Sequence, residues 1–496
     1  MSEIVALLRA DGKRIVHCHG VFDLLHVGHI RHFEEAKARG DILVVTITPD
    51  RFVNKGPHRP AFPEELRAES VAALHCVDFV AINRWPLARE AILLVRPDFY
   101  VKGSDYREAE KDPTGGIKLE EEAVKSVGGQ IAFTDDITFS SSSLINRYLP
   151  AFPEEVTNYL ISFATKHSAD DVIRYLDQAR ALKVLVVGEA IVDEYQYCQA
   201  IGKSSKEPTL AVKLLATEKF AGGILAVGNH VSNFCDTVGL ITFLGSHRSH
   251  EEFIREKLSG NIEARFLYRR DSPTIVKRRF IDKYFFTKLL ETYEINDGAL
   301  DQKDNKELCG VLDDLAPRYD VVIVVDFGHG MLSAEAVDVL CGKSRFLAVN
   351  AQSNAGNLGY HTISRYSRAD YVCMAENEMR LEARDRGGDL RSIVIGVSDR
   401  LRCRQVAVTR GNLGCLCFGN GEGFFEAPAL TRNVVDRVGA GDAFLSLTAP
   451  CVAQGAPMEV VGFLGNVVGA QAVATVGNRT PVERVPLIKH IQSLLK

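Results

Sequence analysis

Short apolar runs alternate with amphipathic stretches over the first 150 residues. The apolar runs are rich in β-branched residues and cover 14–22, 42–48, 77–83, 98–103 and 130–136. Between them, residues 30–40 and 63–75 have the spacing of helices, and the second stretch opens with Pro63 followed by acidic residues. This alternation predicts βαβ units, and hence a parallel sheet with helices on both faces. In such sheets ligands bind beyond the carboxyl ends of the strands.

A second, larger α/β domain is predicted after a helical connection. Residues 151–181 carry helical signals and no strand signal, and a new strand begins at KVLVVGEAIVDEY. Two partly alternating stretches, 210–220 and 275–295, predict a small accessory sheet. Later strands are predicted at 321–328, 346–350, 371–375, 405–409 and 415–419, before a helix entered at Gly441. The predicted organisation is therefore an α/β domain over 1–150, a helical linker over 151–181 and a second α/β domain over 182–496.

Composition narrows the class of protein. A chain of 496 residues is too long for one hydrophobic core, and 46% hydrophobic with 25% charged residues is typical of globular proteins. The net charge of −5 argues against nucleic acid or a membrane as the main partner and leaves small anionic substrates open. The sequence shows no signal-peptide pattern and no apolar run of about 18 residues, so we expect a cytoplasmic protein.

The cysteines also indicate a cytoplasmic protein. The chain has 11 of them, scattered and without a Cys-x-x-Cys pair. Cys415 and Cys417 are two apart, which on a strand places both on one face. Reduced, buried thiols are therefore expected rather than zinc ligands or disulfides.

A pair of histidines follows the first predicted strand directly. In the segment GVFDLLHVGH, His26 and His29 are three residues apart, so at a helix start both imidazoles can point to one side. Gly20 ends the strand, and Gly28 allows close approach to the backbone. The free amides and the positive end of the helix dipole make this position an anion site. A pair of histidines alone is often incidental; the complete string after a strand is more specific.

This arrangement suits nucleotidyl transfer. A phosphate monoester attacks the α-phosphorus of a nucleoside triphosphate, and because its second pKa is about 6, it needs no general base. The transition state needs positive charge and hydrogen-bond donors, which two imidazoles can supply. Further candidates for phosphate binding follow later strands. These are Lys55, Arg59, Lys102, Ser140, Ser141 and Ser142, with a structural role for Lys102 equally compatible.

The segment resembles the HxGH signature of the cytidylyltransferase-like nucleotidyltransferases, and the resemblance covers residues 12–150. It implies a Rossmann-like domain in which His26 and His29 contact the triphosphate, the serine run helps to bind it, and Mg²⁺ takes part. The other positions of the motif that we assign to nucleotide binding are Gly20, Phe22, Asp23 and Gly28.

A glycine-rich turn, Gly439-Ala440-Gly441-Asp442, stands before a helix near the end of the sequence. Glycines one residue apart allow converging amides that cradle an oxyanion. An aspartate at its edge can accept a proton from a substrate hydroxyl during phosphoryl transfer. The plainer alternative is a glycine turn in which Asp442 caps the helix.

The second domain resembles the ribokinase-like (PfkB) carbohydrate kinases, in which the aspartate of GAGD is the catalytic base. By this resemblance Asp442 is catalytic and Gly439, Ala440 and Gly441 bind nucleotide. The resemblance also implies nucleotide contacts at Thr409 and Gly411 and substrate contacts at Asp193, Gly222, Gly223 and Asp326. No residue is assigned as a metal ligand.

The two domains together resemble the bifunctional heptose-7-phosphate kinase/ADP-heptose synthase family with the domain order reversed. Several positions depart from that family and place the kinase activity in doubt. Arg380 stands three residues after Asn377 where an acid is expected, Asn350-Ala351-Gln352 replaces Asp-Pro-Lys, Ile224-Leu225-Ala226 follows the diglycine in place of an asparagine, and Val438 replaces a threonine. Glu376 and Glu378 are the candidates to replace the missing acid.

The preferred hypothesis is a bifunctional enzyme of nucleotide-sugar synthesis. The first domain would join a nucleotide from ATP or CTP to a sugar phosphate, and the second would phosphorylate a sugar or sugar phosphate with ATP. A second hypothesis makes the second domain a catalytically silent binding or oligomerisation module, favoured by Arg380, Gln352 and Ala226. A third gives both domains a substrate other than a heptose. The resemblance also implies a homodimer.

Overall fold

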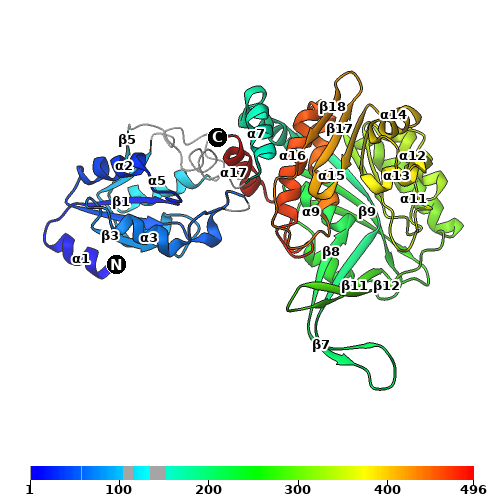
Figure 1. Ribbon diagram of the computed structural model, residues 1–496, viewed down its shortest axis with the longest axis horizontal. Coiled ribbons are helices and arrows are strands. Elements are labelled where there is room, and N and C mark those ends of the chain that lie inside the picture. The colour runs from blue at the N-terminus through cyan, green and yellow to red at the C-terminus, as the bar shows by residue number, and fades with distance from the viewer. Residues whose placement is uncertain (1, 57–58, 104–114, 135–151) are drawn as a thin grey trace. The chain divides into compact units, whose positions relative to one another are not determined.

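Five parallel strands form the sheet of the N-terminal part, in the order β3-β2-β1-β4-β5 (Figure 1). The computed structural model describes residues 2–56, 59–103, 115–134 and 152–496. All five strands lie within the runs predicted from the sequence: β1 (Ile15–Gly20), β2 (Ile42–Ile47), β3 (Phe79–Ile82), β4 (Phe99–Gly103) and β5 (Gln130–Thr134). The order reverses between β1 and β4, so the crevice beyond the carboxyl end of β1 is the expected ligand position.

Helices connect these strands and cover the sheet. Helix α2 follows β1, and its Phe33 packs with Val16 and Val45 in a core that contains no exposed member. Pro63 precedes α3 as predicted, with Glu64 in the first turn. The helices are α1 (Ser2–Ala10), α2 (Val27–Lys37), the 3₁₀ turn η1 (Asp50–Phe52), α3 (Glu64–Ala72), α4 (Arg89–Val95) and α5 (Gly116–Ser126).

The segment predicted as a helical linker is helical. It contains α7 (Glu154–Lys166), α8 (Ala169–Gln178) and the 3₁₀ turn η4 (Ala179–Ala181). Ser168 caps α8 by accepting a hydrogen bond from the Asp171 amide, and Asp171 accepts one from the Ser168 amide. This reciprocal capping fixes the start of α8.

A nine-stranded sheet in the order β10-β9-β6-β13-β14-β15-β16-β17-β18 forms the second α/β unit. Its strands run parallel as far as β16, and β17 and β18 are antiparallel to their neighbours. The strands are β6 (Lys183–Gly188), β9 (Thr237–Gly245), β10 (Ile262–Arg269), β13 (Val321–Asp326), β14 (Leu347–Ala351), β15 (Tyr371–Ala375), β16 (Gln405–Thr409), β17 (Cys415–Gly419) and β18 (Gly423–Ala427).

The accessory sheet is present and has four strands in the order β12-β11-β7-β8. Three of its strands come from the predicted stretches, and the sequence did not predict that β7 continues into it directly after β6. In Figure 1 these strands extend away from the nine-stranded sheet. They are β7 (Ala190–Lys203), β8 (Leu210–Gly223), β11 (Ile275–Asp282) and β12 (Thr287–Glu294).

Helices cover both faces of the nine-stranded sheet, with α9, α15 and α16 on one side and α11 to α14 on the other (Figure 1). The helices and 3₁₀ turns of this part are α9 (Ile224–Ser232), α10 (Glu251–Lys257), α11 (Gln302–Leu315), η5 (Ala316–Arg318), α12 (Ala334–Lys343), η6 (Ile363–Arg365), α13 (Glu376–Ala383), α14 (Leu390–Arg400), η7 (Gly411–Leu413), α15 (Ala440–Ala453), α16 (Met458–Ala472) and α17 (Arg484–Leu494).

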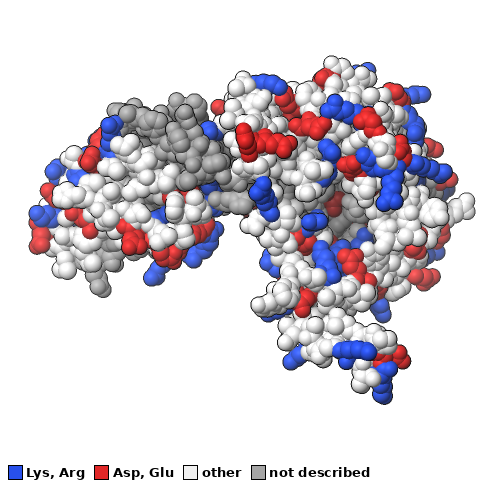
Figure 2. Space-filling view, in the orientation of Figure 1, with Lys and Arg blue, Asp and Glu red and all other residues white. Residues whose placement is uncertain are grey.

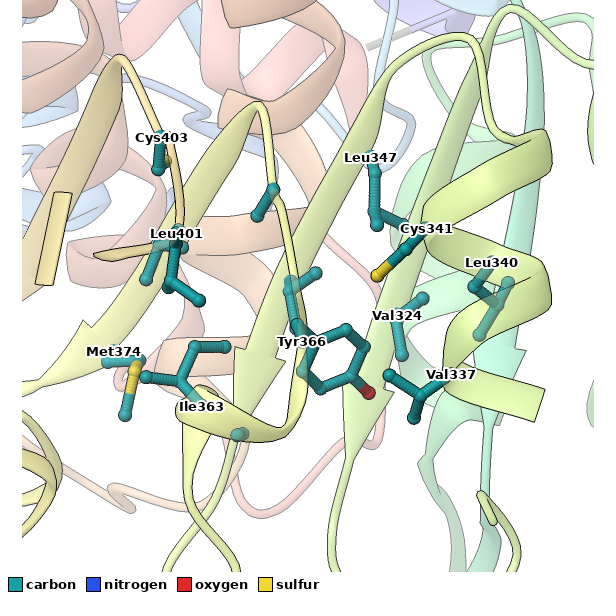
Figure 3. Packing of buried hydrophobic residues seen from close by; sticks show 14 of the residues in the cluster. Val324, Val337, Leu340, Cys341, Leu347, Ile363, Tyr366, Met374, Leu401 and Cys403 are labelled. Carbon is teal, nitrogen blue, oxygen red and sulfur yellow. The ribbon is translucent and has the colours of Figure 1, made fainter. Parts of the chain in front are cut away.

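One face of this sheet packs a continuous apolar core. Figure 3 shows Val337, Leu340 and Cys341 of α12 directed at Val324 and Leu347 of the sheet. All of these side chains are buried. Burial of apolar surface stabilises this packing by about 25 cal/mol per Å².

The described chain divides into two compact units. The first contains Met1–Ile161 together with Val485–Lys496, and the second contains Ser162–Arg484. The last twelve residues therefore belong with the first unit, whereas the sequence assigned them to the second domain. The physical reason is visible at one contact: His490 packs against Gly56 of the first unit. A pattern of local sequence cannot show which unit receives such a helix.

The cysteines are free thiols, as expected, and Cys415 and Cys417 lie on one face of β17 with their sulfurs 3.9 Å apart. Over the part of the chain that the structure describes, no helix has the length and apolarity to cross a membrane. Figure 2 shows basic and acidic side chains interspersed over the face in view, without a large area of one sign.

Candidate functional site

The two histidines of the first motif lie together at the start of helix α2. His26 is the N-terminal cap, and its Nδ1 accepts a hydrogen bond of 3.1 Å from the Gly28 amide. The imidazole rings of His26 and His29 are stacked, with centroids 3.9 Å apart. Both histidines also have a buried ring nitrogen, His26 Nε2 and His29 Nδ1, that finds no hydrogen-bond partner in the described structure. The helix start therefore carries hydrogen-bonding capacity available to a ligand.

Burial disfavours the charged form of both imidazoles. Burial lowers the pKa of His26, and burial together with the neighbouring His26 lowers the pKa of His29 to about 3. A neutral imidazole still donates one N–H, and an anion bound beside it raises its pKa. The pair can therefore offer hydrogen-bond donors to an anion without first being protonated.

Gly20 and Phe22 shape the position of His29. The Phe22 ring meets His29 edge-on at 5.2 Å between centroids and also packs against Phe33 at 4.9 Å. A side chain at position 20 would place its Cβ 2.9 Å from the Phe22 ring, which is too close. Glycine is therefore required at position 20 if Phe22 is to support the histidine.

Asp23 positions the loop that carries Arg59. The Asp23 carboxylate is buried and accepts hydrogen bonds from the amides of Ala61, at 2.7 Å, and Phe62, at 3.2 Å. Arg59 Nη1 lies 3.5 Å from Asp23 Oδ2. The Asp23 carboxylate is thus engaged by the loop that carries Arg59.

Sequence reasoning missed Arg67. Its guanidinium is buried and donates to the backbone carbonyls of Val21, Thr48, at 2.9 Å, and Phe62, at 2.9 Å. It also pairs with Asp50 at 2.5 Å. Arg67 thus ties together the loops that follow β1 and β2 and the start of α3. No local signal could reveal this role, since an arginine on an amphipathic helix is typical of an exposed face.

Lys102 lies in a buried ion pair. Its Nζ is 2.9 Å from Glu120 Oε2, and both side chains are buried. Tyr100 donates its hydroxyl to the same carboxylate at 2.9 Å. These contacts support the structural role that the sequence left open for Lys102. The predicted residues Ser140, Ser141 and Ser142 lie outside the described residues.

A pocket of about 290 Å³ lies in the second unit. Its walls come from the nine-stranded sheet, the accessory sheet and the start of α15. Six predicted residues line it: Asp193, Gly223, Thr409, Gly439, Gly441 and Asp442. Gly222, Asp326, Gly411 and Ala440 were also predicted and are not among the residues that line it.

Asp442 lies in the first turn of α15 and faces this pocket. Burial, with added repulsion from Asp193 and Glu378, raises the pKa of the Asp442 carboxyl to about 7. Lys277 and a hydrogen bond of 3.0 Å from Gln352 Nε2 act in the opposite direction. A carboxylate with a pKa near the working pH is suited to proton transfer.

Asp193 reaches the pocket from strand β7. It pairs with Arg279 of β11, and Arg279 also pairs with Glu291 of β12 at 2.9 Å. A side chain at Gly222 would collide with the Asp193 carboxylate. The diglycine therefore has two separate roles, because Gly222 makes room for Asp193 and Gly223 lines the pocket.

Lys277 of β11 lines the pocket, but sequence analysis did not assign it to the site. Its side chain is buried, and its ammonium lies 5.3 Å from the centre of the Tyr293 ring and 5.5 Å from that of Phe327. Burial lowers its pKa. Lys277 and Arg279 are two residues apart on one strand, and this spacing places both on one face. Their spacing within PTIVKRRF was the signal that could have identified them.

Asp326 organises the pocket wall from inside the core. It is fully buried and contacts His361 at 2.6 Å, Arg365 at 3.1 Å and the Tyr366 hydroxyl at 2.9 Å. Figure 3 shows Tyr366 between the sheet and α12. The next residue, Phe327, lines the pocket. Asp326 is thus a buried residue that holds the wall of the pocket and does not itself line it.

Arg380, the basic residue that placed the kinase activity in doubt, does not line the pocket. Arg380 pairs with Glu376 at 2.8 Å and donates to the Gly388 carbonyl at 2.9 Å. Glu376 also pairs with Arg410 at 3.0 Å. Glu378, by contrast, lines the pocket and accepts hydrogen bonds from the amides of Ser353, at 3.0 Å, and Ala375, at 2.8 Å. Of Glu376 and Glu378, the two candidates to replace the missing acid, only Glu378 lines the pocket.

These residues fit a Mg²⁺ ion held mainly by phosphates. The described residues contain no group of three or more histidine, cysteine or acidic side chains that could hold a metal alone. Magnesium at phosphate sites needs only one or two carboxylates from the protein, with phosphate and water as its other ligands. Burial raises the pKa of Glu378, which a bound cation would lower again.

Comparisons with known proteins match a separate family model to each part of the chain. Residues 17–148 match the family model described as cytidylyltransferase-like, and residues 331–484 match the pfkB family carbohydrate kinase model. The bifunctional protein HldE of Trichlorobacter lovleyi is 35% identical over 160 residues, covering 31% of this chain and 31% of its own length. That of Koribacter versatilis is 43% identical over 152 residues, covering 30% of this chain and 29% of its own length. These matches lie in the N-terminal part.

The matched stretch thus spans about a third of the length of these relatives. The fold of phosphofructokinase-2 from Escherichia coli, in a crystal structure with potassium, covers 64% of this chain and 100% of that chain. The TM-score is 0.52 and the sequence identity is 14%. At this identity the likeness shows the fold alone.

Proposed function

Since the chain joins a cytidylyltransferase-like domain to a pfkB family carbohydrate kinase domain, we propose that it is a bifunctional enzyme of nucleotide-sugar synthesis. The first unit transfers a nucleotidyl group from a nucleoside triphosphate to a sugar phosphate and releases pyrophosphate. The second unit phosphorylates a sugar or sugar phosphate with ATP. The matched HldE relatives favour a heptose-like sugar.

The observation that carries the transferase assignment is the stacked pair His26 and His29 at the start of α2. The imidazole N–H groups and the helix amides can donate to the α-phosphate oxygens as charge develops there. The attacking phosphate oxygen forms the new P–O bond while the bond to pyrophosphate breaks, so no side chain has to remove a proton. Arg59, held by Asp23, adds positive charge near the same loop.

The observation that carries the kinase assignment is that Asp193 and Asp442 line one pocket. Asp193 is placed to orient substrate hydroxyls, and Asp442 accepts the proton from the hydroxyl that attacks the γ-phosphate of ATP. Gly439 and Gly441 leave the start of α15 open to the phosphates. Glu378 and the phosphates would hold a Mg²⁺ ion, which would neutralise charge on the phosphates.

The pocket also supports a substrate that already carries a phosphate. Lys277 and Arg437 line it, and no ion pair of either residue to a carboxylate is found in the described structure. Arg279, by contrast, is engaged by Asp193 and Glu291. Lys277 and Arg437 are suited to binding the phosphate group of a sugar phosphate, so that this group does not contact Asp442.

Two assays on the purified full chain test this proposal. Pyrophosphate release is measured with ATP or CTP and a panel of sugar 1-phosphates, and ADP formation with a panel of sugars and sugar phosphates. We expect Asp442→Asn to abolish ADP formation and spare pyrophosphate release, and His29→Ala to do the reverse. Absence of sugar-dependent ADP formation with every substrate would favour the silent binding module, and survival of both activities in both variants would exclude these roles.

A further inference from the structure

Asp436 is a buried carboxylate shortly before the GAGD turn of the second unit, and donors from four segments surround it. Its Oδ2 accepts hydrogen bonds from the Tyr195 hydroxyl at 2.5 Å and the Gly477 amide at 3.0 Å. Its Oδ1 accepts hydrogen bonds from Lys288 Nζ at 2.8 Å and the Val438 amide at 3.2 Å. Burial acts to raise the pKa of Asp436, but the hydrogen bonds from Lys288 and Tyr195 outweigh burial and hold the pKa below its ordinary value. A single charged group therefore binds four segments of the second unit.

Two of these donors, the amides of Val438 and Gly477, hold the GAGD turn, which is the proposed phosphate cradle. Val438 immediately precedes Gly439, where the turn begins. Gly477 immediately precedes Asn478, whose side chain packs so closely on Gly439 that a Cβ there would collide with it. Val438, Gly439 and Asn478 line the pocket. Asp436 is not among the lining residues, so it holds these parts of the cradle from outside the pocket.

The other two donors belong to the accessory sheet. Tyr195 lies two residues after Asp193 on β7, so both side chains lie on one face of that strand. The Tyr195 ring is fully buried and meets Phe220 of β8 edge-on at 5.0 Å between centroids. Lys288 lies on β12, at the other edge of the same sheet. Asp436 thus also holds the sheet that presents Asp193 to the pocket.

We propose that Asp436 is a positioning residue that couples the two sides of the kinase pocket, the phosphate cradle and the accessory sheet that carries Asp193. This inference rests on the proposed phosphorylation of a sugar or sugar phosphate by the second unit. Nucleotide bound at the cradle restrains the accessory sheet, and because such coupling is reciprocal, a substrate held by Asp193 tightens the binding of nucleotide. Tyr195 takes part in this coupling from outside the pocket, since it is not among the lining residues.

The test uses the full chain and the nonhydrolysable ATP analogue AMP-PNP with Mg²⁺. Hydrogen–deuterium exchange of β7 and β12 is measured with and without the nucleotide. We expect bound nucleotide to slow exchange in both strands of the parent protein, and Tyr195→Phe to lose most of this protection. Calorimetry should show that Tyr195→Phe weakens nucleotide binding about three- to tenfold, as expected when part of the energy of a hydrogen bond to a charged group is lost.

Tyr197→Phe is the matched control. Tyr197 lies two residues further along β7 and donates its hydroxyl to Glu218 at 2.9 Å, so the substitution removes a similar hydrogen bond that does not involve Asp436. This variant should bind AMP-PNP and protect both strands like the parent protein. Asp436→Asn keeps the shape of the side chain and removes its charge, and it should lose the protection as Tyr195→Phe does. Thermal unfolding followed by circular dichroism shows that the variants compared are folded.

The outcomes separate this inference from the proposed function. If the parent protein does not bind AMP-PNP, the kinase assignment fails and the coupling fails with it. If the parent binds AMP-PNP but exchange in β7 and β12 does not change, or Tyr195→Phe protects these strands as the parent does, Asp436 does not couple the two sides. If Tyr197→Phe loses as much protection as Tyr195→Phe, the effect is a general loss of stability in the sheet, and the role of Asp436 is excluded.

Discussion

Gln352 donates a hydrogen bond to Asp442 across 3.0 Å; Gln352 directly follows β14, and Asp442 lies in the first turn of α15. The glutamine stands where the family has a lysine, and it was one reason to doubt the kinase. In the structure it contacts the proposed base directly and favours its ionised form. The replacement therefore keeps a donor beside the aspartate.

The pH dependence of phosphorylation follows from this contact. Asp442 has to be ionised to accept a proton, so the rate should rise with pH through about 7. Gln352→Ala removes a hydrogen bond to the ionised form, and we expect the midpoint to move upward by about one unit. The measurement is kcat/KM for the sugar substrate between pH 5.5 and 9, with Lys303→Ala as a distant control. An unchanged midpoint would mean that Gln352 does not control this carboxyl.

Substitution of Arg380 should affect stability, whereas substitution of Glu378 should affect catalysis. Arg380 is engaged by Glu376 and the Gly388 carbonyl, so Arg380→Ala should lower the melting temperature while kcat stays within about twofold. Glu378→Gln removes the carboxylate that faces the pocket, and we expect kcat to fall about 100-fold with a higher Mg²⁺ requirement. Mg²⁺ titrations of ADP formation by the two variants make the comparison. A large loss of kcat in Arg380→Ala would instead show that Arg380 takes part in catalysis.

The two glycines of the GAGD turn should have different roles, Gly439 in folding and Gly441 in nucleotide binding. Gly439 has φ +82°, and a Cβ there would collide with Asn478, so Gly439→Ala should destabilise the second unit by about 1–3 kcal/mol. Gly441 lies within α15 with open space around its Cα. Gly441→Ala should therefore leave the fold intact and raise KM for ATP about tenfold or more, because the new methyl lies where the phosphates approach. If Gly441→Ala binds ATP normally, the turn is a structural cap and not a phosphate cradle.

The first unit should lose stability in mild acid. Burial lowers the pKa of His17 to about 3, and its Nε2 contacts Thr46 at 2.8 Å. A histidine that stays neutral when folded contributes stability above its unfolded pKa of 6.5, and this is lost as pH falls toward the folded value. We expect a loss of about 2 kcal/mol for His17 between pH 6.5 and 5. His17→Gln keeps a polar contact to Thr46 without titrating, so its unfolding free energy should fall less over this range.

Urea unfolding followed by fluorescence measures this, since Trp85 is the only tryptophan of the chain and lies in the first unit. Equal slopes of stability against pH in the parent and His17→Gln would contradict the prediction. His230→Gln offers a matched control, because His230 is also buried with a pKa lowered to about 4 but lies in the second unit.

The sequence by itself determined the two α/β folds and the start of each site. Period-two and near-continuous apolar runs predicted β1 to β5, β13 to β17 and the accessory sheet, because strand pattern is a local property of the chain. GVFDLLHVGH and Val438-Gly439-Ala440-Gly441-Asp442 each follow a strand or precede a helix, so the positions of His26, His29 and Asp442 at helix starts were also local.

Only the tertiary structure decided which residues share a site. Lys277 and Arg279 face Asp193 because β11 pairs with β7, across more than eighty residues of sequence. Asp326 is turned into the core by Tyr366 and Arg365, about forty residues further along the chain. Helix α17 joins the first unit through His490 and Gly56. Each of these outcomes depends on pairing between segments far apart in the sequence, and no pattern within one segment carries that information.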